Sequence, residues 1–172
     1  MAPAPSAWVV RFADRIRAGG TVLDLACGAG RHTRFFLDQG HPVVAVDRDL
    51  SGLADLCASA ALERVEADLE GGGPWPLRAR AFAGIVVANY LHRPLLPYIA
   101  GALAPAGILV YETFAVGNAA LGRPSNPDFL LRPGELLAAV QGRLDVIAYE
   151  NREVRDPRPA VVQRIAASRP KR

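Results

Sequence analysis

A chain of 172 residues, 51% of them hydrophobic and 22% charged, is expected to fold as one domain spanning 1–172. Its net charge of +3 is too small and too scattered for the clustered basic face that binds nucleic acid, so nucleic acid is not favoured as a partner. No apolar stretch is long enough to cross a membrane, and the two cysteines and three histidines lack the spacing of a disulfide framework or a metal site.

Short apolar runs rich in β-branched residues alternate along the chain with segments whose apolar residues recur at helical spacing. The runs that predict strands are 21–25, 43–47, 64–67, 84–88, 107–112, 144–149 and 160–165. The segments that predict helices are 8–17, 31–39, 50–60, 95–104 and 133–140. This alternation predicts a doubly wound α/β fold with helices on both faces of a mostly parallel, seven-stranded sheet. Because no helix separates the last two strands, one antiparallel strand is expected at or near the sheet edge.

The segment VLDLACGAGRHT (22–33) leads from a buried strand through a turn of small residues into a helix. Gly28 and Gly30 would let the backbone approach a ligand, which the free amides of the helix start would face. An ordinary tight turn is the alternative interpretation. Asp24 favours a ligand with a positive charge, such as an α-amino group or a sulfonium, and would repel a pyrophosphate. Thr33 stands where a dinucleotide-binding turn has its third small residue, which disfavours NAD.

Acidic residues also end the next two predicted strands, at Asp47 and Asp68. The carboxyl ends of parallel strands form the ligand-binding edge of open α/β sheets, and an acid at the end of the second strand accepts hydrogen bonds from ribose hydroxyls. We therefore expect Asp24, Asp47 and Asp68 at one edge. Two alternatives stay open: Asp47 caps the following helix, and Asp68 serves the turn before Gly71.

Together these residues resemble the class I, seven-stranded S-adenosylmethionine-dependent methyltransferases, over 22–165 and most closely over 22–49. The resemblance implies a Rossmann-like fold and S-adenosyl-L-methionine as cofactor. Ala26 replaces the first glycine of the family's D-x-G-x-G-x-G run, a difference of one methyl group. The implied cofactor-binding residues are Asp24, Ala26, Gly28, Gly30, Asp47, Arg48, Asp68, Leu69 and Asn89.

Within that set, the resemblance assigns the glycine turn to the methionine part of the cofactor and Asp47 to the ribose. Asp68 and the backbone of Leu69 would contact the adenine. The backbone of Asn89, after the fourth strand, would lie near the methionine amino group.

The segment 88–94 follows the fourth strand, where the acceptor meets the transferable methyl in this family. Enzymes that methylate base amino groups have two prolines where this chain has Tyr90 and Leu91, so base methylation is not supported. Tyr90 and His92 are candidates to line the acceptor pocket or to take a proton, and Glu112 is a third candidate base. A packed turn with His92 exposed is the alternative.

The segments GRHT and QGHPVVAVD also resemble a bacterial group of small methyltransferases that act on small molecules, with the tellurite-resistance methyltransferases as distant relatives. Only a leading helix in 1–20 and an aperiodic stretch, 115–132, are available to cap the site. We therefore expect a small-molecule acceptor, or a homodimer in which a second subunit completes the pocket. Arg123 and Asn126 are candidate substrate contacts, with the Arg123 guanidinium binding a carboxylate or phosphate unless it is simply a solvated charge.

Because the sulfonium cofactor carries its own leaving group, such an enzyme needs mainly to align its acceptor and exclude water. Three other functions remain open: a non-catalytic module that binds S-adenosylmethionine, an NAD-dependent oxidoreductase and an RNA methyltransferase. The N-terminus shows no secretory signal, so the expected location is cytoplasmic, and no metal is expected.

Overall fold

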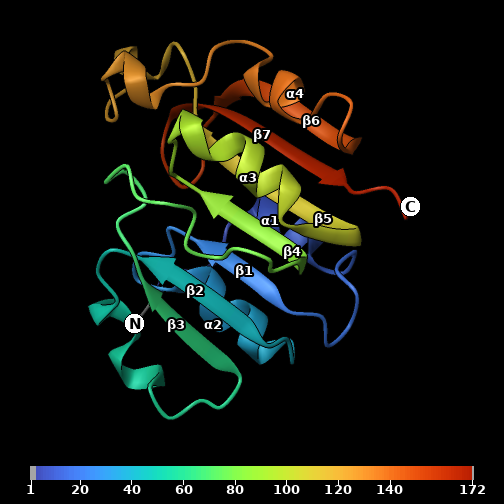
Figure 1. Cartoon of the computed structure of the whole chain (residues 1–172). Coiled ribbons are helices and arrows are strands. Elements are labelled where there is room, and N and C mark those ends of the chain that lie inside the picture. Colours follow the sequence, from blue (N-terminus) through green and yellow to red (C-terminus); the bar gives the residue numbers. More distant parts are fainter. Residues whose placement is uncertain (1–2, 172) are drawn as a thin grey trace.

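A computed structural model describes residues 3–171, and its seven strands form one sheet in the order β3-β2-β1-β4-β5-β7-β6 (Figure 1). The strands are β1 (Val22–Leu25), β2 (Val43–Asp47), β3 (Leu62–Glu66), β4 (Phe82–Ala88), β5 (Leu103–Phe114), β6 (Asp145–Val154) and β7 (Ala160–Ser168). Neighbouring strands are parallel except where β7 pairs with β5 and β6. The predicted doubly wound sheet with one reversed strand beside its edge is therefore confirmed. The first two residues of the predicted leading segment, 1–20, lie outside the described residues.

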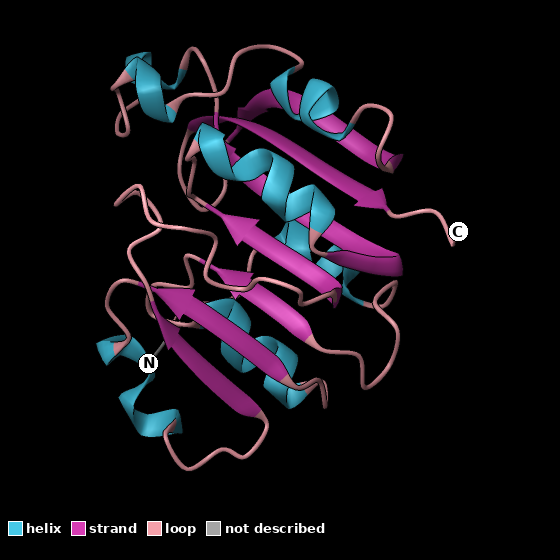
Figure 2. Ribbon diagram, viewed as in Figure 1, coloured by secondary structure: helices cyan, strands magenta, loops and turns pink. Residues whose placement is uncertain are grey.

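Helices cover both faces of the sheet (Figure 2). They are α1 (Ala7–Ala13), α2 (Arg31–Asp38), α3 (Leu96–Gly101) and α4 (Glu135–Val140). On one face α1 and α2 bury Trp8 and Phe36, and on the other α3 and α4 bury Ile99 and Leu136. Since both faces are covered, every residue of β1 is buried, which explains why such strands read as continuous apolar runs. Within 3–171, no helix is long and apolar enough to span a membrane.

The predicted helix 50–60 is wrong, since the segment forms only a short 3-10 helix, Ser51–Leu56. This helix packs closely against the glycine turn: a Cβ atom on Gly52 would lie 2.8 Å from the Cα atom of Ala29. Leu53 is fully buried in a small cluster below that turn. The segment is therefore shaped by contact with the turn rather than by its own helical periodicity.

β5 is longer than the predicted strand 107–112, and the predicted helix 95–104 is correspondingly shorter. Leu103 already pairs with Phe82 of β4, although an irregular register follows directly after Phe82. The pairing moves from Phe82–Leu103 to Gly84–Ile108, so the exposed Pro105 lies in a bulge of β5, where Ala106 has a φ angle of 60°. β6 and β7 also run past their predicted ends because they pair with each other as a hairpin.

The aperiodic stretch 115–132 is a folded connection between β5 and α4, and its two ends pair in an isolated bridge. The buried Asn118 holds it together from inside: its side-chain nitrogen donates to the Pro124 carbonyl at 3.0 Å, and its side-chain oxygen accepts from the Val161 amide at 3.0 Å. The connection lies at the end of the sheet to which the β4 arrow points in Figure 1. Its position is thus compatible with the predicted substrate loop.

Candidate ligand-binding site at the carboxyl edge of the sheet

A cavity of about 480 Å³ lies at the carboxyl ends of β1, β2 and β3. The predicted cofactor residues that line it are Ala26, Asp47, Arg48, Asp68 and Leu69. A neighbouring cavity of about 370 Å³ shares Ala26 and is also lined by Gly28 and Asn89. The structure therefore brings the predicted cofactor residues together, except for Asp24 and Gly30, which line neither cavity.

The two glycines of the turn have different structural roles. Both have positive φ angles, 52° at Gly28 and 77° at Gly30. A Cβ atom on Gly28 would meet nothing within 4 Å, so this position leaves room for a ligand. A Cβ atom on Gly30 would lie 2.1 Å from Cδ2 of Leu53, so the small residue is needed for packing inside the protein. The expectation that both glycines admit a ligand is thus supported by geometry only at Gly28.

Ala26 also adopts a left-handed conformation, with a φ angle of 56°. A side chain with a Cβ atom costs about 1–2 kcal/mol there relative to glycine. Interpreting the alanine as a change of one methyl group therefore overlooked its main effect, which is on the backbone. The strain falls at the point shared by the two cavities.

Asp47 ties the glycine turn to the end of β2. Its Oδ2 atom accepts a hydrogen bond from the Gly28 amide at 2.8 Å, and its Oδ1 atom accepts one from the Asp49 amide at 3.2 Å. The alternative interpretation of Asp47 as a helix cap is wrong, because the 3-10 helix that follows has Leu50 at its N-cap and no side-chain cap. Each carboxylate oxygen keeps a second lone pair for a ligand hydroxyl.

Asp24 is buried behind the turn, where its Oδ2 atom accepts a 2.7 Å hydrogen bond from the Thr33 hydroxyl. Burial raises the pKa of this carboxyl from 3.8 to about 6, although the Thr33 hydrogen bond opposes the shift. Thr33, which the sequence marked only as an exception to the dinucleotide pattern, is thus the partner of Asp24. Asp24 therefore lies behind the turn and is not part of the wall of either cavity.

At the end of β3, Asp68 faces the cavity while its Oδ1 atom accepts a hydrogen bond from the Glu70 amide at 3.0 Å. The turn interpretation of Asp68 is therefore confirmed, and its place in the cavity wall is compatible with the predicted adenine contact. Glu70, which the sequence analysis missed, lines the same cavity and a further one of about 240 Å³.

Tyr90 is the one candidate base that lines these cavities, and it borders both the 480 Å³ and the 240 Å³ space. Its hydroxyl is buried and has no hydrogen-bond partner among residues 3–171. Burial, together with the charge of Glu70, raises the pKa of the Tyr90 phenol above its usual value of 10. The phenol therefore keeps its proton at neutral pH and is suited to donate a hydrogen bond rather than to accept a proton.

The other two candidate bases lie elsewhere. Glu112 pairs with Arg164 of β7 at 3.8 Å and lines none of the cavities described here. His92 is half-buried at the start of a 3-10 helix, Arg93–Leu95, and also lies outside the cavity walls. The interpretation of His92 as part of a packed turn fits this position better than a role as base.

Arg93, which the sequence analysis passed over, holds the 115–132 connection against the sheet edge. Its guanidinium donates to the Asp128 carbonyl at 2.7 Å and the Leu130 carbonyl at 2.9 Å, and its Nε atom lies 2.6 Å from Oε1 of Glu135. These bonds fix the residues on either side of Phe129, which lines the main cavity. Only the folded structure shows this role, because the partners lie far apart in sequence.

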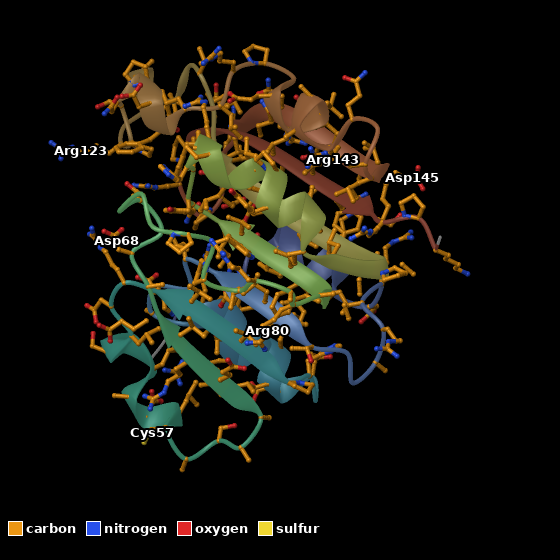
Figure 3. The ribbon with its side chains drawn as sticks, in the orientation of Figure 1. Cys57, Asp68, Arg80, Arg123, Arg143 and Asp145 are labelled. Carbon is orange, nitrogen blue, oxygen red and sulfur yellow. The ribbon has the colours of Figure 1, made fainter. Side chains whose placement is uncertain are left out.

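The two predicted substrate contacts lie in one wall of a more open cavity of about 420 Å³, which Arg158 of the β6–β7 turn also lines. Asn126 uses its side-chain oxygen to accept a hydrogen bond from the Asp128 amide at 3.0 Å. Arg123 extends outward at the same end of the molecule as Asp68, whereas Arg143 and Asp145 lie at the opposite end (Figure 3).

Two further side chains near the glycine turn, those of His32 and Cys27, are buried. His32 lines the 370 Å³ cavity and accepts a hydrogen bond from the Ser6 amide at 3.1 Å, so it does not face solvent. Burial, with a smaller effect of Arg31, lowers the pKa of His32 to about 4, which leaves it neutral. Cys27 packs below the turn, and burial raises the pKa of its thiol above the usual range.

The edge is dominated by carboxylates: Asp47, Asp68 and Glu70 lie in the main cavity and Asp24 lies behind it. Among residues 3–171 no group of three or more potential ligands could hold a metal ion. An arrangement of this kind suits an uncharged ribose with a positively charged group nearby and disfavours a pyrophosphate.

Comparison with known proteins shows which fold this structure shares. No protein-family model and no curated protein matches the sequence. The structure is similar to TehB from Haemophilus influenzae, with a TM-score of 0.76 and 18% identity over 98% of this chain and 63% of that one. The chain therefore spans less than two thirds of the length of TehB.

Two other similar structures cover more of their own chains. A SAM-dependent methyltransferase from Methanosarcina mazei has a TM-score of 0.73 and 13% identity over 99% of this chain and 100% of that one. The 1,6-didemethyltoxoflavin-N1-methyltransferase of Burkholderia thailandensis, with bound 1,6-didemethyltoxoflavin and S-adenosylhomocysteine, has a TM-score of 0.69 and 20% identity over 95% and 76%. The protein thus has the Rossmann-like fold of the S-adenosylmethionine-dependent methyltransferases, which confirms the resemblance at the level of the fold.

Replacing Ala26 by glycine is expected to stabilise the protein. The change Ala26→Gly relieves the left-handed strain but adds backbone freedom to the unfolded chain, so the free energy of unfolding should rise by about 0.5–1 kcal/mol. Urea denaturation measures this difference. The control Ala29→Gly changes a neighbouring exposed alanine without a positive φ angle and should lower stability instead. Equal effects of both changes would contradict the assignment of strain to Ala26.

Replacing Asp24 by asparagine is expected to change how stability depends on pH. Because folding raises the pKa of Asp24 from 3.8 to about 6, the stability linked to its protonated form is complete below 3.8 and lost as pH rises through 6. At pH 8, Asp24→Asn should therefore raise the free energy of unfolding by about 3 kcal/mol, a gain that disappears near pH 3. Denaturation at both pH values tests this, with Asp14→Asn at an exposed position as control. A difference that does not depend on pH would contradict burial as the cause.

Proposed function

We propose that this protein is an S-adenosylmethionine-dependent methyltransferase that acts on a small-molecule acceptor. The observation that carries the proposal is the cavity at the ends of β1, β2 and β3, where Asp47 anchors the glycine turn and faces the same space as Asp68 and Leu69. Gly28 supports a fit to the cofactor, since the position of its missing side chain is open space.

In this proposal each strand end binds one part of the cofactor. Asp47 accepts hydrogen bonds from the ribose hydroxyls through its free lone pairs, and Asp68 with the Leu69 backbone contacts the adenine. The turn at Ala26 and Gly28, with Asn89, surrounds the methionine part. Arg48 lines the adenosine side of the cavity and Asp24 supplies negative charge behind the turn.

The cofactor, when bound, supplies a methyl group on a sulfonium that is its own leaving group. What remains for the chain is to align the acceptor and to keep bulk water away. Tyr90 and Phe129 border the cofactor cavity and the adjoining 240 Å³ cavity, so they suit the alignment of an acceptor. Glu70 is a carboxylate at the same border and replaces His92 and Glu112 as the candidate proton acceptor.

Calorimetric titration with S-adenosylmethionine, S-adenosylhomocysteine and NAD tests the proposal. The first two ligands should bind and NAD should not. Asp47→Ala should weaken binding by about a hundredfold, since it removes two charge-assisted hydrogen bonds. Asp49→Ala is the matched control, because it removes the same charge from the same turn without changing the cavity wall.

Failure of both adenosyl ligands to bind a folded sample at millimolar concentration would overturn the proposal. Binding without methyl transfer to any acceptor in a broad small-molecule screen would instead favour a regulatory module that only binds the cofactor.

A further inference from the structure

Three cavities of this protein are neighbours in a row. The 480 Å³ cavity and the 240 Å³ cavity share Glu70, Tyr90 and Phe129 as walls. The 240 Å³ cavity and the 420 Å³ cavity share Pro124 and Phe129. A path therefore leads from the proposed cofactor site, past Phe129, to the mouth at Arg123.

The middle cavity has mostly apolar walls. Leu91, Phe114, Pro124 and Phe129 line it, so a ligand body that is flat and apolar gains most from burial there. Its volume lies below the usual range for drug-sized ligands, so the body must be small. The Tyr90 hydroxyl, which no residue of the described range 3–171 hydrogen-bonds, lies at the inner end of this cavity, where a polar atom of the ligand would satisfy it.

The outer cavity carries positive charge that the protein leaves without a counter-ion. Arg123 and Arg158 line it, and within residues 3–171 neither forms a salt bridge. Arg158 is held in place, because its guanidinium carbon lies 5.7 Å from the centre of the Phe114 ring and its Nη2 atom donates to the Arg123 carbonyl at 3.2 Å. The Phe114 ring that contacts the Arg158 guanidinium is also a wall of the middle cavity, so the positive charge lies directly beside the apolar space.

The charges at the two ends of this row of cavities also favour one orientation of a bound ligand. Glu70 at the inner end would repel an anion, whereas the two arginines at the outer end would attract one. An amphipathic anion therefore enters with its apolar part first and leaves its charge at the mouth.

We propose that the methyl acceptor is a small molecule with an apolar, ring-sized body and an anionic group, a carboxylate or a phosphate. The body lies against Phe114 and Phe129, the anion faces Arg123 and Arg158, and the atom that receives the methyl points toward Tyr90. This assignment rests on the proposed methyltransferase function for its role as acceptor, but the binding site itself does not depend on the cofactor.

Binding of four matched probes tests the assignment: benzoate, phenyl phosphate, neutral benzamide and cationic benzylamine. Each is titrated into the protein at low salt, with and without S-adenosylhomocysteine, and followed by ligand-observed NMR. Both anions should bind about fivefold more tightly than benzamide, the factor expected for exposed ion pairs, and benzylamine should bind most weakly. Whether benzoate or phenyl phosphate binds more tightly decides between the two anion types.

Variants separate the two parts of the site. Arg158→Gln and Arg123→Gln should each reduce the preference for anions, and the double variant should remove it. Arg155→Gln, at an exposed arginine of the same turn that lines no cavity described here, should leave it unchanged. Phe129→Ala should weaken the binding of all four probes by a similar factor, because it removes a wall of the apolar cavity.

Equal binding of anions and benzamide, an anion preference that survives in the double variant, or no binding of any probe at millimolar concentration would overturn the assignment. Failure of the cofactor proposal would look different. In that case S-adenosylhomocysteine would not bind, while the anion preference and its loss in the arginine variants would persist.

Discussion

The hydrogen bond from the Gly28 amide to the Asp47 carboxylate is the contact on which the proposed site depends. It joins the turn after β1 to the end of β2, and the same carboxylate faces the main cavity. With Asp47 fixed by two backbone amides, its remaining lone pairs keep a defined direction toward a ligand. The glycine turn, Asp47 and the cavity wall are therefore one structural unit.

Two features of this structural unit lower the stability of the folded protein. Ala26 holds a left-handed conformation at the junction of the two cavities, and Asp24 is a buried carboxyl with a raised pKa. The core compensates through Leu53, which fills the space that Gly30 leaves, and through the Thr33 hydroxyl on Asp24. Strain and buried charge of this kind commonly gather at functional sites, where they prepare the site for its ligand.

The sequence correctly predicted the elements that are determined by the pattern of their own residues. β2 was predicted with its observed bounds, since an apolar run ends there at Asp47. Asp47 and Asp68 lie at the predicted edge, whereas Asp24 is buried within β1, behind the cavity. Predictions failed where distant contacts decide the structure. The segment 50–60 forms only a short 3-10 helix because it packs against the glycine turn, and β5 begins as early as Leu103 because Phe82 of β4 pairs with it there. Arg93 and Arg158 carried no local signal, because their roles follow from partners far away in the chain.

The central claim is that the ends of β1, β2 and β3 bind one adenosyl ligand together, and amide NMR spectra during titration with S-adenosylhomocysteine test it most directly. The account predicts that the largest shifts fall together on the amides of Gly28, Asp49 and Leu69, with little change in the β6–β7 hairpin. Absence of shifts at saturating ligand, or shifts confined to residues away from these three turns, would contradict it.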